Sequence, residues 1–306
     1  MKKEITFVVL MLISAASLAQ QSFDTLRIRP QKITDNIYLL KGSGGNIGLM
    51  SGKDGTLMID DQFAPLSNKI NGAIKTLDPG EIRFLINTHI HGDHSGGNEN
   101  FKRMDATIVA QDLVRERMMK ESVGRNGQKV APRDQDAWPV ITFPDRMTFH
   151  LNDEDIDLIH LDPGHTDGDV LVYFKKANIY HTGDAFTRGG YPFIDLSNGG
   201  SFAGYISSLD KMLALMDDNS KVIPGHGELA TKADVKIFRD KLIDIRDQVN
   251  AALKKGTKIE DIAALGITDK YEAAWGKGFV KGKDFVLLVA DNMKAQMPVT
   301  LKKGKK

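Results

Sequence analysis

The chain of 306 residues contains no cysteine, and this absence excludes several kinds of chemistry at once. Disulfides, thiolate metal ligands, catalytic thiols and lipid-modified N-terminal cysteines are all ruled out. The chain also lacks a dominant charge, since 41 Lys and Arg residues against 40 Asp and Glu residues give a formal net charge of +1. Without a strong field of either sign, we expect binding to neither nucleic acid nor a membrane surface. What remains, 41% hydrophobic and 26% charged residues, is the composition of an ordinary globular protein.

Long apolar runs are also missing, except at the start of the chain. Lys2 and Lys3 precede an apolar run over 5–16, and Ser17-Leu18-Ala19 ends in the small residues that a signal peptidase requires. The alternative, a membrane anchor, is disfavoured because a bilayer span needs about 20 apolar residues. We therefore predict a signal peptide over 1–19, cleavage after Ala19, and a periplasmic or secreted mature protein without a membrane anchor. No linker divides 20–306, which we predict to be a single domain.

The mature chain begins with short apolar runs and continues with alternating strand and helix patterns. Helical spacing is found around 66–77, 206–216, 238–253 and 285–293. A polar stretch over 122–139, which holds Gly124, Gly127 and Pro132, predicts a surface loop. The predicted strands are 37–40, 46–50, 56–59, 81–87, 107–110, 147–151, 156–161, 170–174, 178–182 and 222–223.

The strongest chemical signal is Thr88-His89-Ile90-His91-Gly92-Asp93-His94, directly after a predicted strand. Residues two apart at a strand end point the same way, so His89 and His91 can bind one metal ion. Gly92 permits a sharp turn, after which Asp93 and His94 can reach a second ion. An exposed polar loop is the alternative, and it is the weaker one because such a dense run rarely arises by chance.

Three later turns each supply one further ligand candidate. His165 lies in Pro-Gly-His-Thr, Asp184 in Thr-Gly-Asp, and His226 in Pro-Gly-His-Gly. Each is weak alone, because a single histidine in a turn is more often structural. Together with the first motif they give two ligand sets joined by one carboxylate: His89, His91 and His165; Asp93, His94 and His226; and Asp184 between them. Imidazole and carboxylate ligands suit Zn²⁺, with iron or manganese as alternatives.

The order and spacing of these motifs resemble the metallo-β-lactamase superfamily over nearly all of the mature chain. The resemblance implies an α+β fold, the αββα four-layer sandwich, with the metals where strand-end loops meet. It also implies that Asp60 is an acid behind the metal ligands.

The chain departs from that family at the fourth motif. Class B1 metallo-β-lactamases place a cysteine there and class B3 enzymes a serine, whereas this chain has Asp184, as glyoxalase II-like thioesterases and lactonases do. Arg188 and Asn198 resemble substrate-binding residues of the periplasmic β-lactamases. We expect both to contact a small-molecule substrate, which can be anionic.

We therefore expect an exported hydrolase with two Zn²⁺ ions per chain, whose bridging hydroxide attacks the carbonyl of an ester, thioester, lactone or lactam. Asp93 is the predicted catalytic residue, which orients the hydroxide and returns the proton. Two enzymatic alternatives stay open, namely β-lactam hydrolysis as the main activity and an iron-dependent oxidoreductase on the same fold. A non-catalytic metal-binding protein is a third.

Overall fold

The computed structural model describes residues 23–77, 80–123 and 128–296. The predicted signal peptide and the basic end of the chain lie outside these ranges. Within them, no helix combines the length and the apolar character that a transmembrane span requires.

Two β-sheets form the centre of the molecule. The first has seven strands in the order β1-β2-β3-β4-β5-β6-β9, and the second has six, in the order β10 to β15. A small third sheet pairs β7 with β8. The strands are β1 (Arg29–Lys32), β2 (Ile37–Lys41), β3 (Ile47–Met50), β4 (Thr56–Ile59), β5 (Ile82–Ile86), β6 (Thr107–Gln111), β7 (Ser122–Val123), β8 (Lys129–Val130), β9 (Ile141–Phe143), β10 (Arg146–Leu151), β11 (Glu154–His160), β12 (Val170–Phe174), β13 (Ile179–His181), β14 (Lys221–Ile223) and β15 (Ala230–Thr231).

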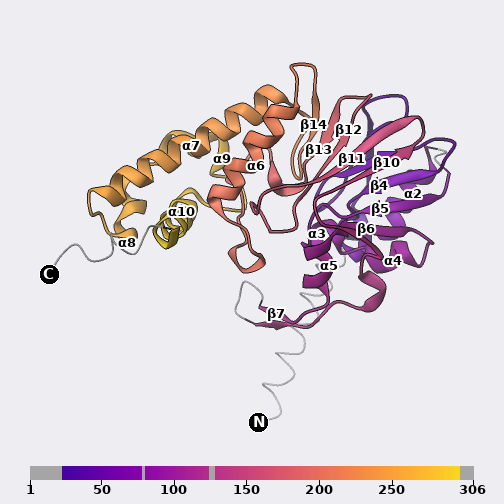
Figure 1. Cartoon of the computed structure of the whole chain (residues 1–306), viewed down its shortest axis with the longest axis horizontal. Coiled ribbons are helices and arrows are strands. Elements are labelled where there is room, and N and C mark those ends of the chain that lie inside the picture. The colour runs from indigo at the N-terminus through magenta and orange to yellow at the C-terminus, as the bar shows by residue number, and fades with distance from the viewer. Residues whose placement is uncertain (1–22, 78–79, 124–127, 297–306) are drawn as a thin grey trace, which may run out of the picture.

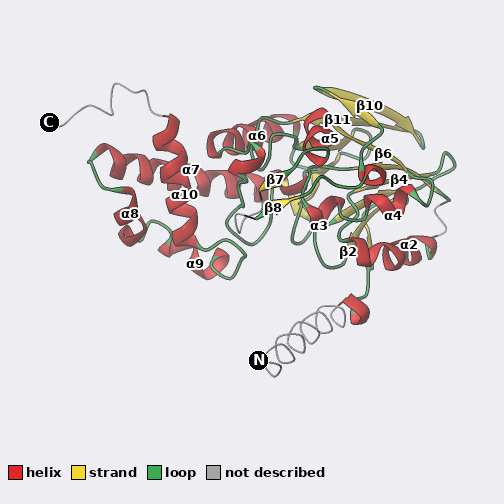
Figure 2. Cartoon of the chain, turned by 90° about the horizontal axis from the view of Figure 1, so that it is seen from below, coloured by secondary structure: helices red, strands yellow, loops and turns green. Residues whose placement is uncertain are grey.

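Helices cover the outer faces of the two large sheets, and Figure 1 shows α7, α8, α9 and α10 gathered at the end remote from α2 and α4. Seen from below in Figure 2, α10 crosses α7, and the two helices pack against each other. The α-helices are α2 (Ser67–Lys75), α3 (Gly92–Ser95), α4 (Asn98–Lys102), α5 (Asp112–Met118), α6 (Phe202–Leu215), α7 (Lys232–Lys254), α8 (Ile259–Ile262), α9 (Asp269–Trp275) and α10 (Gly282–Gln296). The short 3-10 helices are η1 (Ala64–Leu66), η2 (Gln135–Ala137), η3 (Gly183–Ala185), η4 (Leu196–Asn198) and η5 (Ala263–Leu265).

Three buried clusters show that these layers form the predicted αββα sandwich. One cluster lies between the two sheets and includes Leu57 and Val172, both fully buried. A second joins the outer face of the first sheet to α2 through Ile70, and the third joins the second sheet to α6 through Leu209. Burying apolar side chains stabilises each interface by about 25 cal/mol per Å², so the stacking is the main source of stability.

Side-chain caps fix where the two large helices of the second half begin. Ser201 accepts a hydrogen bond from the Gly204 amide at the start of α6. Thr231 and Asp234 form a reciprocal capping box at the start of α7. The helix predicted around 238–253 therefore begins earlier than its apolar stripe, since the cap and not the stripe sets its first residue.

The surface loop predicted over 122–139 contains short regular elements that the sequence did not indicate. Its described residues include β7, β8 and η2, and Ala137 is buried. Asp134 caps η2 by accepting the amide hydrogen of Asp136, a local contact without any hydrophobic periodicity.

Candidate metal centre

The strand-end loops of both sheets bring the predicted ligands together. His89 and His91 follow β5, and Asp93 and His94 lie in the short helix α3 that begins after His91. Asp184 lies in η3 just after β13, and His226 follows β14, whose parallel pairing with β13 places both turns at one edge. The structure thus assembles the seven predicted side chains from 89–226 at one place.

The first ligand set consists of His89, His91 and His165, whose ligand nitrogens all lie within 4.8 Å of one another. His91 Nδ1 and His165 Nε2 are 2.8 Å apart. Both rings are oriented from behind, since His91 Nε2 lies 2.8 Å from Asp195 Oδ2 and His165 Nδ1 lies 2.7 Å from the Phe193 carbonyl oxygen.

These outer contacts determine which nitrogens carry hydrogen. A carbonyl oxygen only accepts, so His165 donates through Nδ1 and keeps a lone pair on Nε2. The Asp195 carboxylate likewise accepts a hydrogen bond from His91 Nε2, which leaves a lone pair on His91 Nδ1. Two lone pairs therefore face each other across 2.8 Å, an arrangement that a shared cation would stabilise.

A similar relay orients His89. The Thr88 hydroxyl donates to Asp60 Oδ2 and so accepts from His89 Nδ1, 3.0 Å away. His89 Nε2 is then a bare acceptor, and it is buried without a hydrogen-bond partner. Such an unsatisfied buried atom is costly unless a ligand pairs with it. This set therefore fits a metal ion.

The second ligand set consists of Asp93, His94 and His226. His226 Nε2 lies 3.3 Å from Asp93 Oδ2 and 3.2 Å from His94 Nε2. Asp60 holds the other side of His94, with its Oδ2 atom 2.7 Å from His94 Nδ1. The implied role of Asp60 behind the ligands is confirmed, and its positive φ of 62° aims the carboxylate into this position.

Asp184 lies between the two sets. Its Oδ1 atom is 3.2 Å from His94 Nε2 and 3.4 Å from His226 Nε2, whereas its Oδ2 atom is 3.6 Å from His165 Nε2. Oδ1 is buried without hydrogen-bond geometry to any partner among the described residues. One carboxylate that reaches both sets is the arrangement needed to bridge two cations.

The two sets differ in electrostatics. Burial lowers the pKa of His89 well below its usual range and that of His165 to about 4, so both imidazoles are neutral and ready to bind metal at pH 7. In the second set burial also opposes protonation, but Asp184 and Asp60 outweigh it and raise the pKa of His94 well above normal. Asp184 and Asp93 similarly raise the pKa of His226 to about 9.

Asp93 of the second set and the shared Asp184 are both ionised. Burial opposes ionisation of Asp184, but His94 and His226 hold its pKa well below the usual range. Burial likewise opposes ionisation of Asp93, and the hydrogen bond from His226 lowers its pKa overall. Without a cation, the second set and Asp184 are held together by the attraction between imidazolium and carboxylate charges. A bound divalent ion would take the place of the imidazolium charges.

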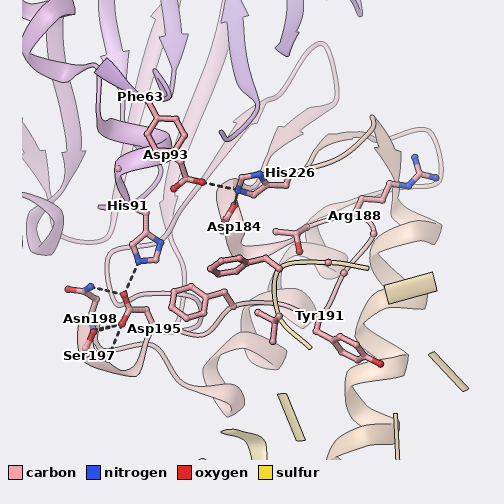
Figure 3. A pocket seen from close by; sticks show the side chains of 18 of the residues that line it. Phe63, His91, Asp93, Asp184, Arg188, Tyr191, Asp195, Ser197, Asn198 and His226 are labelled. Carbon is pink, nitrogen blue, oxygen red and sulfur yellow. Dashed lines mark hydrogen bonds and ion pairs between the residues drawn. The ribbon is translucent and has the colours of Figure 1, made fainter. Parts of the chain in front are cut away.

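A cavity of about 790 Å³ opens beside the ligands. Figure 3 shows His91, Asp93, Asp184 and His226 at its inner end. Its wall includes the aromatic residues Phe63, Tyr191, Phe193 and Phe279 and the polar residues Asp195, Ser197 and Asn198.

Arg188 and Asn198, the two residues predicted to contact substrate, line this cavity, but their side chains form hydrogen bonds to other residues of the protein. Arg188 points away from His226 in Figure 3, and its guanidinium donates to the Leu229 carbonyl oxygen at 2.5 Å and to Asp234 at 3.1 Å. Asn198 Nδ2 donates to Asp195 Oδ2 at 2.7 Å. Their contact with substrate stays a prediction.

The sequence did not single out Asp195 or Asp169. Asp169 is buried and accepts the amide hydrogens of His165 and Thr166, which fixes the turn that carries the ligand. Asp195 lies three residues before Asn198, in the loop predicted to contact substrate. An isolated aspartate in a loop gives no pattern, so only the proximity of these residues to predicted ligands could have indicated them.

Residues 40–226 match the model of the metallo-β-lactamase superfamily. The human acyl-coenzyme A thioesterase MBLAC2 is 25% identical over 60% of this chain and 74% of its own length. The hydroxyacylglutathione hydrolase of Pelagibacter ubique is 28% identical over 59% of this chain and 63% of its own length. The bovine MBLAC2 matches over only 54% of its length, so these proteins' activities are not transferred on similarity alone.

The fold comparison agrees with the sequence comparison. A metallo-β-lactamase from Pontibacter korlensis superposes with a TM-score of 0.59 at 17% identity, covering 71% of this chain and all of that one. At this identity the likeness concerns the fold. With the family match over 40–226 and the two His/Asp ligand sets, the chain belongs to the metallo-β-lactamase superfamily and is a metal-dependent hydrolase.

Proposed function

We propose that the protein uses two zinc ions to hydrolyse an ester or thioester. The observation that carries the proposal is the Asp184 carboxylate between the two ligand sets, where Asp184 Oδ1 and His89 Nε2 are both buried acceptor atoms without hydrogen-bond partners. Nitrogen and oxygen ligands without thiolate suit zinc. The names of two relatives, a thioesterase and a hydroxyacylglutathione hydrolase, support cleavage at a carbonyl.

Each set has a distinct role in this proposal. One cation would be held by the first ligand set, His89, His91 and His165. The other would be held by the second set, Asp93, His94 and His226, and Asp184 would bind both cations. When bound, two such ions would lower the pKa of a shared water toward about 7 and polarise the substrate carbonyl.

Asp93 is the residue we assign to proton transfer. Its carboxylate lines the cavity and is ionised, since the hydrogen bond from His226 lowers its pKa. It orients the attacking water and takes its proton while the water oxygen bonds to the carbonyl carbon. When the carbon–oxygen or carbon–sulfur bond breaks, Asp93 returns that proton to the leaving alkoxide or thiolate.

The test is a hydrolysis panel on zinc-loaded, full-chain protein. Esters, thioesters, lactones and lactams are compared with His91→Ala as the inactive variant and His150→Ala as its control, because His150 is exposed on β10, away from the ligand sets. We expect ester or thioester turnover that His91→Ala abolishes and His150→Ala leaves unchanged. Lactams as the preferred substrates, or iron with oxygen uptake, would overturn the proposal.

Export is part of the same proposal and rests on the signal-like sequence of 1–19. Cell fractionation with N-terminal sequencing tests it. We expect a periplasmic or secreted protein that begins at Gln20, whereas an uncleaved protein in the cytoplasm would contradict export.

A further inference from the structure

Phe279 is a large apolar side chain with 75% of its surface exposed. Single exposed hydrophobic residues are common on proteins, so exposure alone has no significance. Phe279, however, lines the cavity beside the metal ligands and lies outside the family-matched residues 40–226. A ligand that covered this ring would gain about 25 cal/mol for each Å² of apolar surface removed from water.

Phe193 connects Phe279 to the ligand histidines. Its ring centroid lies 5.7 Å from that of His91 and 5.9 Å from that of His165. On the other side, Phe193 and Phe279 have centroids 6.2 Å apart in an edge-to-face arrangement. An aromatic wall thus runs from the first ligand set toward the exposed face of the cavity.

The segment that carries Phe279 is held in place by the body of the protein. Val280 forms a β-bridge with Tyr191, and the Tyr191 hydroxyl donates to Glu272 Oε1 at 2.8 Å. Gly278 passes so close to Gly190 that a Cβ atom added there would lie 3.2 Å from the Gly190 Cα. These contacts join the segment between α9 and α10 to the cavity wall and fix the position of Phe279.

The charged side chains of the cavity lining are bonded to other side chains or belong to the candidate metal centre. Arg188 is the one lysine or arginine among the described residues that line the cavity, and it is bonded to Asp234. Of the acids in the lining, Asp195 is bonded to His91, and Asp93 and Asp184 belong to the candidate metal centre. The wall formed by Phe193 and Phe279 therefore offers its contact mainly to apolar groups.

From these observations we infer that Phe193 and Phe279 form a subsite for a neutral apolar chain attached to the scissile ester or thioester, and that Phe279 determines specificity for its length. This inference rests on the proposed hydrolytic function and narrows its substrate class.

The first experiment measures kcat/KM with zinc-loaded, full-chain protein. One series of p-nitrophenyl esters varies the acyl chain from acetate to octanoate, and a second varies the alcohol of acetate esters from ethyl to octyl, which identifies the side that carries the apolar chain. We expect one series to rise by about 10-fold or more with chain length. Phe279→Ala should lower kcat/KM for the longest substrate of that series about 10-fold and for the shortest less than about twofold.

Leu265→Ala is the matched control, since Leu265 is 53% exposed in the same C-terminal part of the chain and does not line the cavity. It should leave both series unchanged. Two flat series, or equal losses on short and long substrates in Phe279→Ala, would overturn the subsite.

A second experiment separates this inference from the proposed function. Binding of N-phenyl-1-naphthylamine, a neutral apolar fluorophore, is measured on metal-free protein, where no turnover is needed. We expect binding that Phe279→Ala and Phe193→Ala each weaken about 10-fold and Leu265→Ala does not. If no ester or thioester is hydrolysed, the proposed function fails, while the fluorophore still decides on the subsite: equal affinities in wild type and Phe279→Ala would overturn it.

Discussion

His91 Nε2 lies 2.8 Å from Asp195 Oδ2, and this contact turns the Nδ1 lone pair of His91 toward His165. Carboxylates behind metal-binding imidazoles fix the tautomer and raise the basicity of the ligand. Asp195 itself is held by Ser197 and Asn198, so the whole turn supports one ligand ring.

Asp195→Ala should therefore weaken zinc binding at the first ligand set by about 10- to 100-fold. Competition with a chromophoric chelator measures the affinity. Asn198→Ala is the control, because it removes a contact to Asp195 without touching His91, and we expect a smaller loss. Unchanged affinity in Asp195→Ala would remove Asp195 from this role.

Gly45 is required for a close approach to His94. A Cβ atom at this position would lie 2.1 Å from His94 Cε1, so Gly45→Ala must displace the imidazole. We expect this variant to lose the zinc ion of the second set. Gly72→Ala in α2 is its control, since no atom lies within 4 Å of the added Cβ; it should bind zinc normally and gain about 0.5–1 kcal/mol of stability. Two zinc ions in Gly45→Ala would contradict the geometry.

Zinc binding should release protons at pH 7. Burial opposes protonation of His226 and His94, but the neighbouring carboxylates outweigh it. They raise the pKa of His226 to about 9 and also raise that of His94. Both imidazoles are therefore protonated in the metal-free protein and must become neutral to bind zinc, which releases about two protons. Calorimetry in buffers of different ionisation enthalpy measures the number. Release of no protons would show that these histidines are not ligands.

The same shift predicts a pH dependence of stability without metal. Because the folded pKa of His226 exceeds the unfolded value of 6.5, its contribution to the free energy of unfolding is complete below about pH 6.5. It is lost as the pH rises through about 9. Urea unfolding of wild type and His226→Asn should therefore differ most at low pH and converge above pH 9. A difference that grows with pH would have the wrong sign.

Arg188 provides a test of the predicted anion contact. Its guanidinium is bonded to the Leu229 carbonyl oxygen and to Asp234. The predicted contact requires Arg188→Ala to lower kcat/KM more for anionic than for neutral substrates, and equal losses would contradict it. Kinetics with a matched ester pair that differs in one carboxylate decides the question. A loss confined to the anionic ester would show that Arg188 leaves Asp234 to bind substrate.

The sequence predicted that the seven candidate ligands lie together, because they are concentrated at strand ends. Short apolar runs located β5, β13 and β14, and in the structure the parallel pairing of β13 with β14 brings Asp184 and His226 to the edge where His89 lies. The short edge strands β1 and β15 were missed, because their residues carry no long apolar pattern.

The contacts that orient the candidate ligands could not be predicted from the sequence. Asp195 acts through one hydrogen bond to a ring that lies 104 residues earlier in the chain, and no spacing rule reports such a contact. The position of Phe279 depends on the bridge between Tyr191 and Val280, which tertiary packing alone creates. Periodicity predicts elements, whereas the relation between loops follows from how the elements pack.

Zinc stoichiometry combined with turnover tests the central claim most directly. The wild-type chain, dialysed against zinc and freed of excess metal, should contain two zinc ions and hydrolyse an ester or thioester. Asp184→Asn should bind zinc more weakly and lose activity by orders of magnitude, because the shared carboxylate of the two sets is gone. A wild-type chain that hydrolyses these substrates with fewer than one equivalent of any metal, or an Asp184→Asn variant with full activity, would contradict the account.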